Sequence, residues 1–134
     1  MDPITAAIAV AAAAGVAAGV TEAGKKLIGD AYEALKALLK KKLGAESEVV
    51  KSAEAVMAKP DSAGRRETLK EEVKSAKADQ DGELVAAARA LIETVKASPR
   101  GEQIITTTIG DYNVTAIGSG ITINVNTPSA QKKT

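Results

Sequence analysis

The sequence contains no cysteine and no histidine, and its only aromatic residues are Tyr32 and Tyr112. Without cysteine there are no disulfides and no thiolate metal sites. Without histidine the chain lacks the commonest general base and the commonest metal ligand, so Ser-His-Asp and Cys-His catalytic sets are excluded. We therefore expect a protein that is not an enzyme and binds no cofactor or metal ion. Its core must be built from Ala, Val, Leu and Ile.

An excess of charge of either sign is also lacking. The chain has 18 Lys and Arg against 17 Asp and Glu, a formal net charge of +1. This balance gives no bulk attraction to nucleic acid, and the lysine run 40–42 has no aromatic neighbours on which bases could stack. We expect no nucleic-acid partner. The chain begins with Met1 and the acidic Asp2, whereas secretory signals begin with a basic region, so the expected location is the cytoplasm.

Residues 4–20 form the longest apolar stretch, ITAAIAVAAAAGVAAGV. Asp2 can cap a helix here, and Pro3 suits its first turn. Seventeen residues of helix span about 26 Å, slightly less than the roughly 30 Å hydrocarbon core of a bilayer. Gly15 and Gly19 form a G-x-x-x-G pair of the kind that lets helices pack closely in lipid. The stretch predicts either a marginal membrane helix or the central helix of a soluble core.

Further helices follow from apolar residues at i, i+3 and i+4 spacing. One runs from Thr21, which either caps it or continues the first helix, to about Gly44. Others cover about 46–59, a segment capped by Asp61 or Ser62, and a segment capped by Asp81. The residues expected to face inward include Leu27, Leu35, Leu39, Val49, Val56, Leu69, Val73, Ala76, Leu84, Leu91 and Ile92. The fold class predicted for this region is an all-α bundle of four to five helices.

The character of the sequence changes after Ser98-Pro99-Arg100-Gly101, a set of helix breakers. Residues 102–127, EQIITTTIGDYNVTAIGSGITINVNT, contain no Lys or Arg and are rich in Ile, Val and Thr, which favour strands. So short a β-region has too little apolar surface to fold alone. Its composition favours cross-β pairing between copies, and the alternatives are an ordinary hairpin, a flexible tail or strands docked on the bundle. The predicted division is a helical domain, 1–99, and a β-prone, amyloid-forming tail, 100–134.

Two segments of this tail, IGDYNV at 109–114 and IGSGI at 117–121, resemble bacterial amyloid signalling motifs, in particular those related to the animal RHIM. Thr108 and Ala116 stand where the RHIM core usually has Gln or Asn. The layout of the whole chain is similar to that of bacterial Bell-domain proteins. In these, a helical death-inducing domain related to HET-S/HeLo domains, with an apolar first helix, precedes such a motif.

The resemblance implies a cell-death effector in defence against phage. An NLR-like sensor with a matching motif would template the tail, which self-associates into cross-β fibrils. The clustered helical domains would then expose the first helix to membrane lipids and permeabilise the cytoplasmic membrane. Two alternatives remain open at this point: a soluble adaptor that recruits a partner through the bundle while the tail assembles, and a plain helical structural protein with a docked tail.

Two groups of residues are the candidates for these roles. Lys25 and Lys26 follow the first helix directly and would be drawn to anionic lipid on the cytoplasmic side. The residues predicted to carry membrane insertion are Ile4, Ile8, Val10, Gly15, Gly19 and Val20. Those predicted to carry amyloid assembly are Ile109, Gly110, Asn113, Val114, Ile117, Gly118, Ile121 and Ile123.

Overall fold

The computed structural model describes residues 2–17 and 19–109. This part of the chain is all-α, as predicted, and holds six α-helices instead of four or five. The helices are α1 (Pro3–Val16), α2 (Glu22–Leu43), α3 (Glu48–Ala58), α4 (Ala63–Ala76), α5 (Gly82–Ala97) and α6 (Gly101–Ile109), with a short 3-10 helix, η1 (Ala78–Gln80), between α4 and α5.

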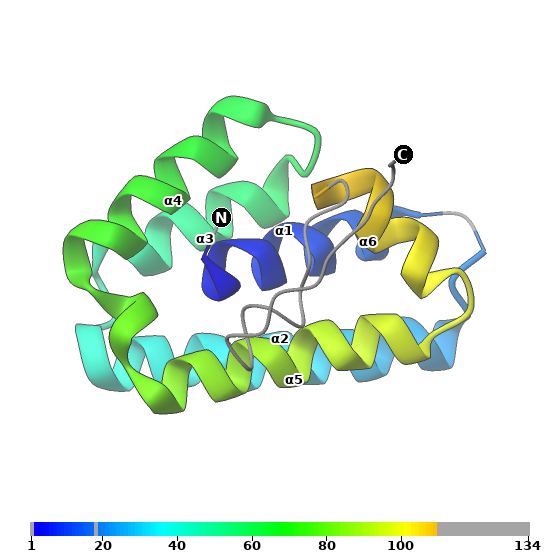
Figure 1. Ribbon diagram of the computed structural model, residues 1–134, viewed down its shortest axis with the longest axis horizontal. Helices are drawn as coiled ribbons and strands as arrows, with labels where there is room; N and C mark the ends of the chain where they lie inside the picture. The colour runs from blue at the N-terminus through cyan, green and yellow to red at the C-terminus, as the bar shows by residue number, and fades with distance from the viewer. Residues whose placement is uncertain (1, 18, 110–134) are drawn as a thin grey trace, which may run out of the picture.

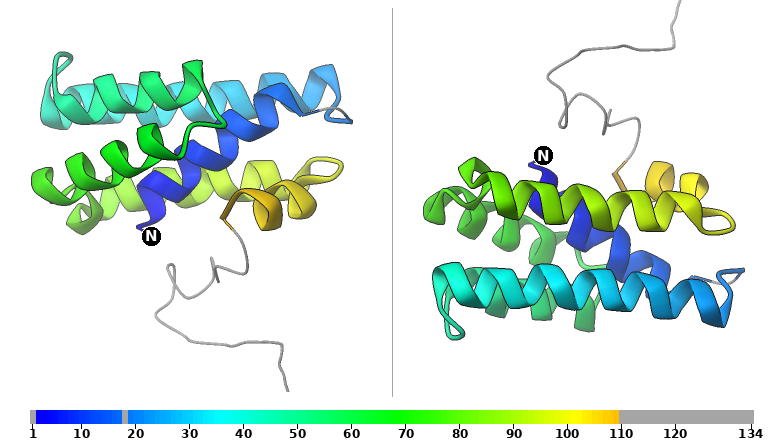
Figure 2. Two further views of the ribbon diagram at one scale, coloured as in Figure 1. Left: turned by 90° about the horizontal axis from the view of Figure 1, so that it is seen from above. Right: turned by 90° about the horizontal axis from the view of Figure 1, so that it is seen from below.

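Helix α1 is the centre of the bundle. The two longest helices, α2 and α5, lie side by side and run in opposite directions, and α3 and α4 pack against each other on the other side of α1 (Figure 1). Seen from above and below, α1 crosses obliquely between these helices, and α6 lies beside its second half (Figure 2). Helix α1 contacts each of the other five α-helices.

The helix boundaries follow from capping side chains in the sequence. The side chains of Asp2, Thr21, Ser62 and Asp81 each accept a hydrogen bond from a backbone amide in the first turn of α1, α2, α4 and α5, as a helix N-cap does. Thr21 therefore begins a new helix, and α1 and α2 are separate. Gly19 makes the turn between them with a φ of 92°, a conformation that glycine adopts without steric cost.

The core contains most of the residues predicted to face inward, among them Leu35, Leu39 and Leu91, which are fully buried. Leu27 is a wrong prediction, because 61% of this side chain is exposed. The buried stripe of α2 instead begins at Ile28 and continues through Tyr32. Ala76, also predicted to face inward, is exposed at the end of α4. A one-residue shift turns a helical position by about 100°, so an isolated apolar residue is a poor guide to the buried face.

The predicted end of the helical region at 98–101 is wrong. Residues Gly101–Ile109 form α6, although the β-branched run from Ile104 to Ile109 has low helix propensity. Ile104 and Ile105 are 8% and 9% exposed, against α1 and α5. Burial of these two side chains outweighs the local preference for strand. The rest of the predicted β-prone tail, 110–134, lies outside the described residues.

Candidate functional site: the central helix and its cover

Helix α1 is buried on every side instead of along one stripe. Ile4 through Ala12, together with Ala14, are buried without interruption, and the predicted membrane residues Ile4, Ile8 and Val10 have no exposed surface. A helix that is apolar all round belongs either in the centre of a protein or in a membrane. In this structure the alanines allow five helices to pack closely round it, so it is the central core helix.

The N-terminal end of α1 is fixed by a pair of short hydrogen bonds. The backbone amide of Thr5 donates to Asp2 Oδ1 at 2.7 Å, and the Thr5 hydroxyl donates to Asp2 Oδ2 at 2.7 Å. Thr5 has no exposed surface, so without Asp2 its hydroxyl would be a buried polar group that lacks this partner. Asp2 therefore caps the helix and satisfies its one buried hydroxyl.

The C-terminal end of α1 is more open. Gly15 lies exposed in the last turn, Gly19 lies in the turn that follows, and Val20 is buried. The two glycines are therefore on different elements and do not form a G-x-x-x-G face in this structure. Val16 is 71% exposed. No helix among the described residues combines the length and the hydrophobicity needed to cross a bilayer.

The approach of α6 to α1 depends on the junction between α5 and α6. Arg100 has a φ of 65°, in the left-handed region, and this residue turns the chain back toward α1. Its side chain lies against Gly19, where a Cβ atom would overlap it. A Cβ atom at Gly101 would overlap the carbonyl oxygen of Val95, which already accepts a hydrogen bond from the Ser98 hydroxyl at 2.6 Å. The junction thus connects α6 both to α5 and to the α1–α2 turn.

A groove of about 320 Å³ remains between α1 and α6. Ala13 and Ala17 line it from the α1 side, and Ile104 and Thr107 line it from α6. Arg100, Gln103 and Thr108 complete the lining. Within residues 2–17 and 19–109 no ion pair or hydrogen bond is described between these side chains across the groove, and the buried surface beside it is that of Ile104 and Ile105. Cohesion here comes from apolar burial.

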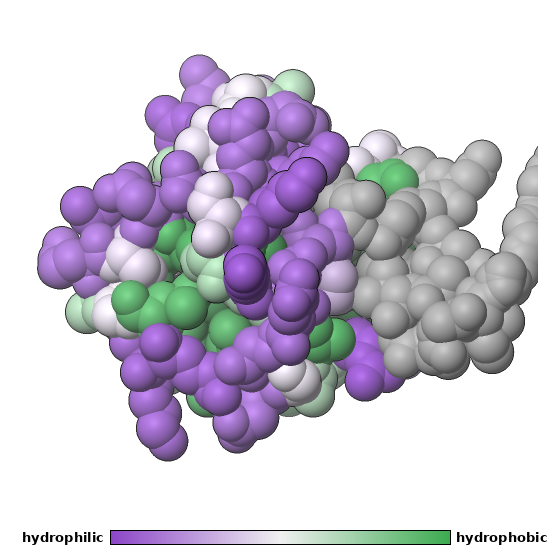
Figure 3. All heavy atoms as spheres, turned by 60° about the vertical axis from the view of Figure 1, so that its left-hand side comes forward, coloured by the Kyte–Doolittle hydropathy of each residue, from purple (hydrophilic) through white to green (hydrophobic). Residues whose placement is uncertain are grey.

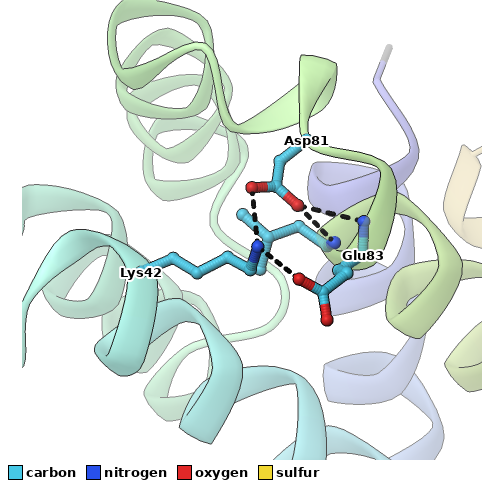
Figure 4. A network of polar contacts seen from close by, with 4 residues as sticks. Lys42, Asp81 and Glu83 are labelled. Carbon is cyan, nitrogen blue, oxygen red and sulfur yellow. Dashed lines mark hydrogen bonds and ion pairs between the residues drawn. The ribbon is translucent and has the colours of Figure 1, made fainter.

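Polar contacts hold the outer helices together. Lys42 Nζ near the end of α2 contacts Asp81 Oδ2 at 3.1 Å and Glu83 Oε1 at 2.6 Å, at the start of α5 (Figure 4). The hydrogen bonds to Glu83 and Asp81 raise the pKa of Lys42. The amide of Leu84, followed by the ammonium of Lys42, lowers the pKa of Asp81. Asp81 therefore both caps α5 and links α5 to α2.

A second polar contact joins α2 to α3. Lys36 Nζ lies 3.0 Å from Glu54 Oε2 and 5.9 Å from the centre of the Tyr32 ring. The pKa of Lys36 is raised mainly by its hydrogen bond to Glu54. Tyr32 is 5% exposed, and its hydroxyl has no hydrogen-bond partner in the part of the chain that the structure describes. Burial, with smaller effects from Glu33 and Glu54, raises the pKa of Tyr32 to about 12.

The residues predicted for amyloid assembly are almost all outside the described part of the chain. Ile109 alone is described, and it lies half-buried at the end of α6. Helix α6 was not predicted, because its β-branched residues favour strand. A helical signal was present in the spacing of Ile104, Ile105, Thr108 and Ile109, which places all four on one helix face.

The outer surface of the bundle is mainly polar on the side that can be seen in the space-filling view (Figure 3). On the face shown in Figure 3, hydrophilic side chains predominate and hydrophobic areas between them are small. Among residues 2–17 and 19–109 no group of acidic side chains is arranged to hold a metal ion.

A comparison with protein families gives a match over the whole chain. The family model for the Het-E N-terminal domain matches the chain over residues 1–134. No curated protein and no solved structure gives a significant match.

Proposed function

The chain belongs to the Het-E N-terminal domain family, and we propose that it is a cell-death effector whose bundle is opened by assembly of its C-terminal tail. In this proposal an NLR-like sensor templates the tail into cross-β fibrils. Assembly unfolds α6, uncovers α1 and delivers it to the membrane. The setting is defence against phage, as the resemblance to Bell-domain proteins implies.

The proposal rests on an overlap between the helix α6 of the structure and the segment predicted to assemble. Residues 103–109 begin the stretch predicted to form cross-β strands, and in the resting chain they lie in α6, packed on α1. Strand formation by these residues and the docked α6 exclude each other. Growth of a fibril from 110 toward 103 would therefore release α1 from α6.

The composition of α6 supports such a conversion. Ile104, Ile105 and Ile109 alternate with threonines in a run that favours strand over helix. The helix has nine residues, shorter than the roughly 12–15 residues at which an isolated helix becomes even marginal in water. Helix α6 is therefore stable only while it is docked. A fibril that incorporates its last residues shortens the helix and removes part of its contact with α1, so the remaining residues also lose their helical structure.

Release of α6 has two local consequences. It exposes the side of α1 that carries Ala13 and Ala17, which now line the groove against α6. It also removes Arg100 from Gly19 and so frees the turn that follows α1. Apolar surface exposed on many copies held close together makes membrane binding cooperative.

The length of α1 favours action by an oligomer or at the bilayer surface over a single span. Fourteen residues extend about 21 Å as a helix, and inclusion of residues 17–20 brings this to about 27 Å, below the roughly 30 Å of a hydrocarbon core. This shortness is also the observation that favours the second candidate function, a soluble adaptor that recruits a partner through the bundle while the tail forms fibrils. Flotation with liposomes after seeding distinguishes the two.

The first experiment seeds the full chain with fibrils of a peptide covering residues 103–126. We expect thioflavin-positive growth with a 4.7 Å reflection, followed by leakage of dye from liposomes. The chain has no cysteine, so Ala13→Cys with Thr107→Cys can be joined across the α1–α6 groove by a cleavable bifunctional thiol reagent.

The cross-linked chain should not release dye, and cleavage of the linker should restore leakage. Each single-cysteine variant, treated with the same reagent, is the control. Leakage from the cross-linked chain at the rate of the cleaved chain would contradict the release of α1.

A second experiment addresses α1 itself. Aspartate at Ala11 or Ala14 is a poor test because both are buried, at 1% and 0% exposure, and a buried charge would unfold the bundle. Val16 is exposed, so Val16→Asp should leave the resting fold and the fibrils intact and reduce leakage. Leu27→Asp, at another exposed apolar residue outside α1, is the matched control and should leak normally. Equal leakage from both variants would exclude α1 as the membrane element.

A further inference from the structure

A pocket of about 570 Å³ lies between α2 and α3, two helices that are neighbours in the bundle (Figure 2). It is lined by three carboxylates, those of Asp30, Glu33 and Glu54, and by one ammonium, that of Lys36. Three negative charges against one positive charge leave an excess of two. Asp30 also pairs with Lys26, but these side chains are 66% and 77% exposed, and so exposed a pair is weak. The pocket therefore attracts cations.

Glu33 is the lining carboxylate that the fold leaves without a partner. Glu54 Oε2 lies 3.0 Å from Lys36 Nζ, whereas Glu33 forms no ion pair or hydrogen bond with the described residues. An exposed carboxylate by itself is ordinary on a protein surface. The case for a ligand therefore depends on a second group in the same pocket, the Tyr32 hydroxyl.

The Tyr32 hydroxyl is a polar group whose hydrogen bond the described chain does not supply. Tyr32 lines the pocket and is only 5% exposed. Its oxygen is the one buried side-chain polar atom without a hydrogen-bond partner among residues 2–17 and 19–109. The hydroxyls of Thr94 and Ser98, by contrast, donate to backbone carbonyls. A buried hydroxyl without a partner destabilises the fold, so its presence at the wall of a pocket points to a ligand.

The charges that act on this hydroxyl favour a cationic ligand. Burial, followed by the carboxylates of Glu33 and Glu54, raises the pKa of Tyr32 to about 12. Both carboxylates line the pocket, so the hydroxyl is subject to a negative potential from that side. An ammonium has three N–H donors and no acceptor. It can therefore donate to the hydroxyl oxygen and to a carboxylate at the same time.

Lys36 shows how an ammonium is held here. Its Nζ contacts Glu54 and lies 5.9 Å from the centre of the Tyr32 ring, within the distance at which a ring face attracts a cation. The pocket thus already holds an ammonium of its own chain. Because the lysine side chain is long and flexible, it can turn away and leave this place to another ammonium.

We propose that the pocket between α2 and α3 binds an aliphatic diamine. One ammonium is held by the Tyr32 hydroxyl and Glu54, where it displaces Lys36. The other ammonium is held by Glu33, and Met57 provides an apolar wall for the carbon chain. Two ammonium groups match the excess of two negative charges. The site includes neither α6 nor the tail, so it is tested independently of the proposed function.

The experiment titrates the full chain with putrescine at constant ionic strength and follows the backbone amides by NMR. We expect saturable shifts concentrated at residues 29–36 and 54–58. The diol of the same chain length has no charge and should produce no shifts.

Tyr32→Phe is the most informative variant, because it removes only the hydroxyl and should make the resting chain more stable. Its affinity for putrescine should nevertheless be about tenfold weaker, since a hydrogen bond to a charged group is lost. A loss of affinity in a more stable chain is not a consequence of unfolding. Lys36→Gln removes the competing ammonium and should strengthen binding.

Glu33→Gln should weaken binding several-fold. Glu71→Gln removes the same charge from α4, outside the pocket, and should leave the affinity unchanged. Shifts that do not saturate, or equal weakening by Glu71→Gln, would mean that putrescine only screens the surface charge and would overturn the proposal. An unchanged affinity in Tyr32→Phe, or weaker binding by Lys36→Gln, would overturn it as well.

Discussion

The backbone of Gly101 packs so closely against Val95 that a Cβ atom at position 101 would overlap the carbonyl oxygen of Val95. This contact lies where α5 ends and α6 begins, and it sets the angle at which α6 approaches α1. The placement of α6, one of the five helices that surround α1, thus depends on one position without a side chain.

Replacement of this glycine should separate α6 from the bundle. Gly101→Ala is expected to cost about 1–3 kcal/mol in the free energy of unfolding, as overpacking usually does, because the neighbour that it meets is backbone and cannot rotate away. Urea denaturation measures the loss, and amide hydrogen exchange in α6 should accelerate most. Gly15→Ala is the control: nothing lies within 4 Å of a Cβ there, and this change should stabilise by about 0.5–1 kcal/mol. If Gly101→Ala is as stable as the wild type, the close packing does not hold α6.

The cap of α1 makes a second prediction. Asp2→Ala removes the acceptor for both the Thr5 amide and the Thr5 hydroxyl, and we expect a loss of about 1–2 kcal/mol, since an N-cap is lost and a buried hydroxyl is left unpaired. A double-mutant cycle with Thr5→Val separates the two contributions in thermal and urea unfolding. Additive losses would show that the side chains of Asp2 and Thr5 do not interact.

Tyr32 makes a third prediction. Tyr32→Phe should raise the free energy of unfolding by about 1 kcal/mol near neutral pH, because it removes a buried hydroxyl that has no protein partner in the described part of the chain. A lower stability would show that this hydroxyl is hydrogen-bonded in solution.

The same residue should make stability depend on alkaline pH. The pKa of Tyr32 is raised to about 12 in the folded chain, against about 10 when unfolded, so the unfolded state ionises first. Stability is therefore fully present below pH 10 and declines as the pH rises toward 12. Urea midpoints across this range should fall more steeply for the wild type than for Tyr32→Phe. Parallel curves would contradict the assignment.

The contact between Lys42 and Asp81 makes a prediction at acid pH. The pKa of Asp81 is lowered first by the Leu84 amide and then by Lys42, so Lys42→Gln should raise it only in part. The contribution of Asp81 to stability is present above the carboxyl's ordinary pKa and is lost as pH falls through the lowered value. Carboxyl ¹³C titration by NMR measures the shift, with Lys26→Gln, which affects the separate pair with Asp30, as the control. A return of Asp81 to its ordinary pKa would show Lys42 to be the main cause.

Lys77 ends α4 in the left-handed region, with a φ of 57°. Glycine adopts this conformation without the steric cost that other residues have, so Lys77→Gly should stabilise the chain by about 0.5–1 kcal/mol, as judged by urea unfolding. Lys77→Ala keeps the Cβ atom and should not stabilise. A gain of the same size in both variants would mean that charge, and not backbone conformation, is responsible.

The fold was predictable where local chemistry decides it. Caps at Asp2, Ser62 and Asp81 and the apolar spacing of α5 act within one or two turns, so they can be read in a single sequence. Leu27 and the segment 102–109 show where such interpretation fails. Which face of α2 is buried, and whether the run around Ile104 is strand or helix, depends on neighbours far away in the chain. Only part of the candidate site could be predicted from the sequence. The residues of α1 were identified, but α6, one of the helices packed on α1, was not.

The sequence by itself determined that no chemistry in this protein depends on histidine or cysteine, that the region before the tail is helical, and that the apolar stretch 4–20 begins as a helix. Composition and short-range hydrogen bonding suffice for these, whereas the end of α1 at Val16 came from the structure. Only the tertiary structure decided that α1 is surrounded by the other helices and that residues 101–109 dock on it as a helix. The physical reason is that burying Ile104 and Ile105 against α1 and α5 contributes more than the preference of β-branched residues for strand. That preference is local, and the surface that overrides it is assembled only when the bundle has folded.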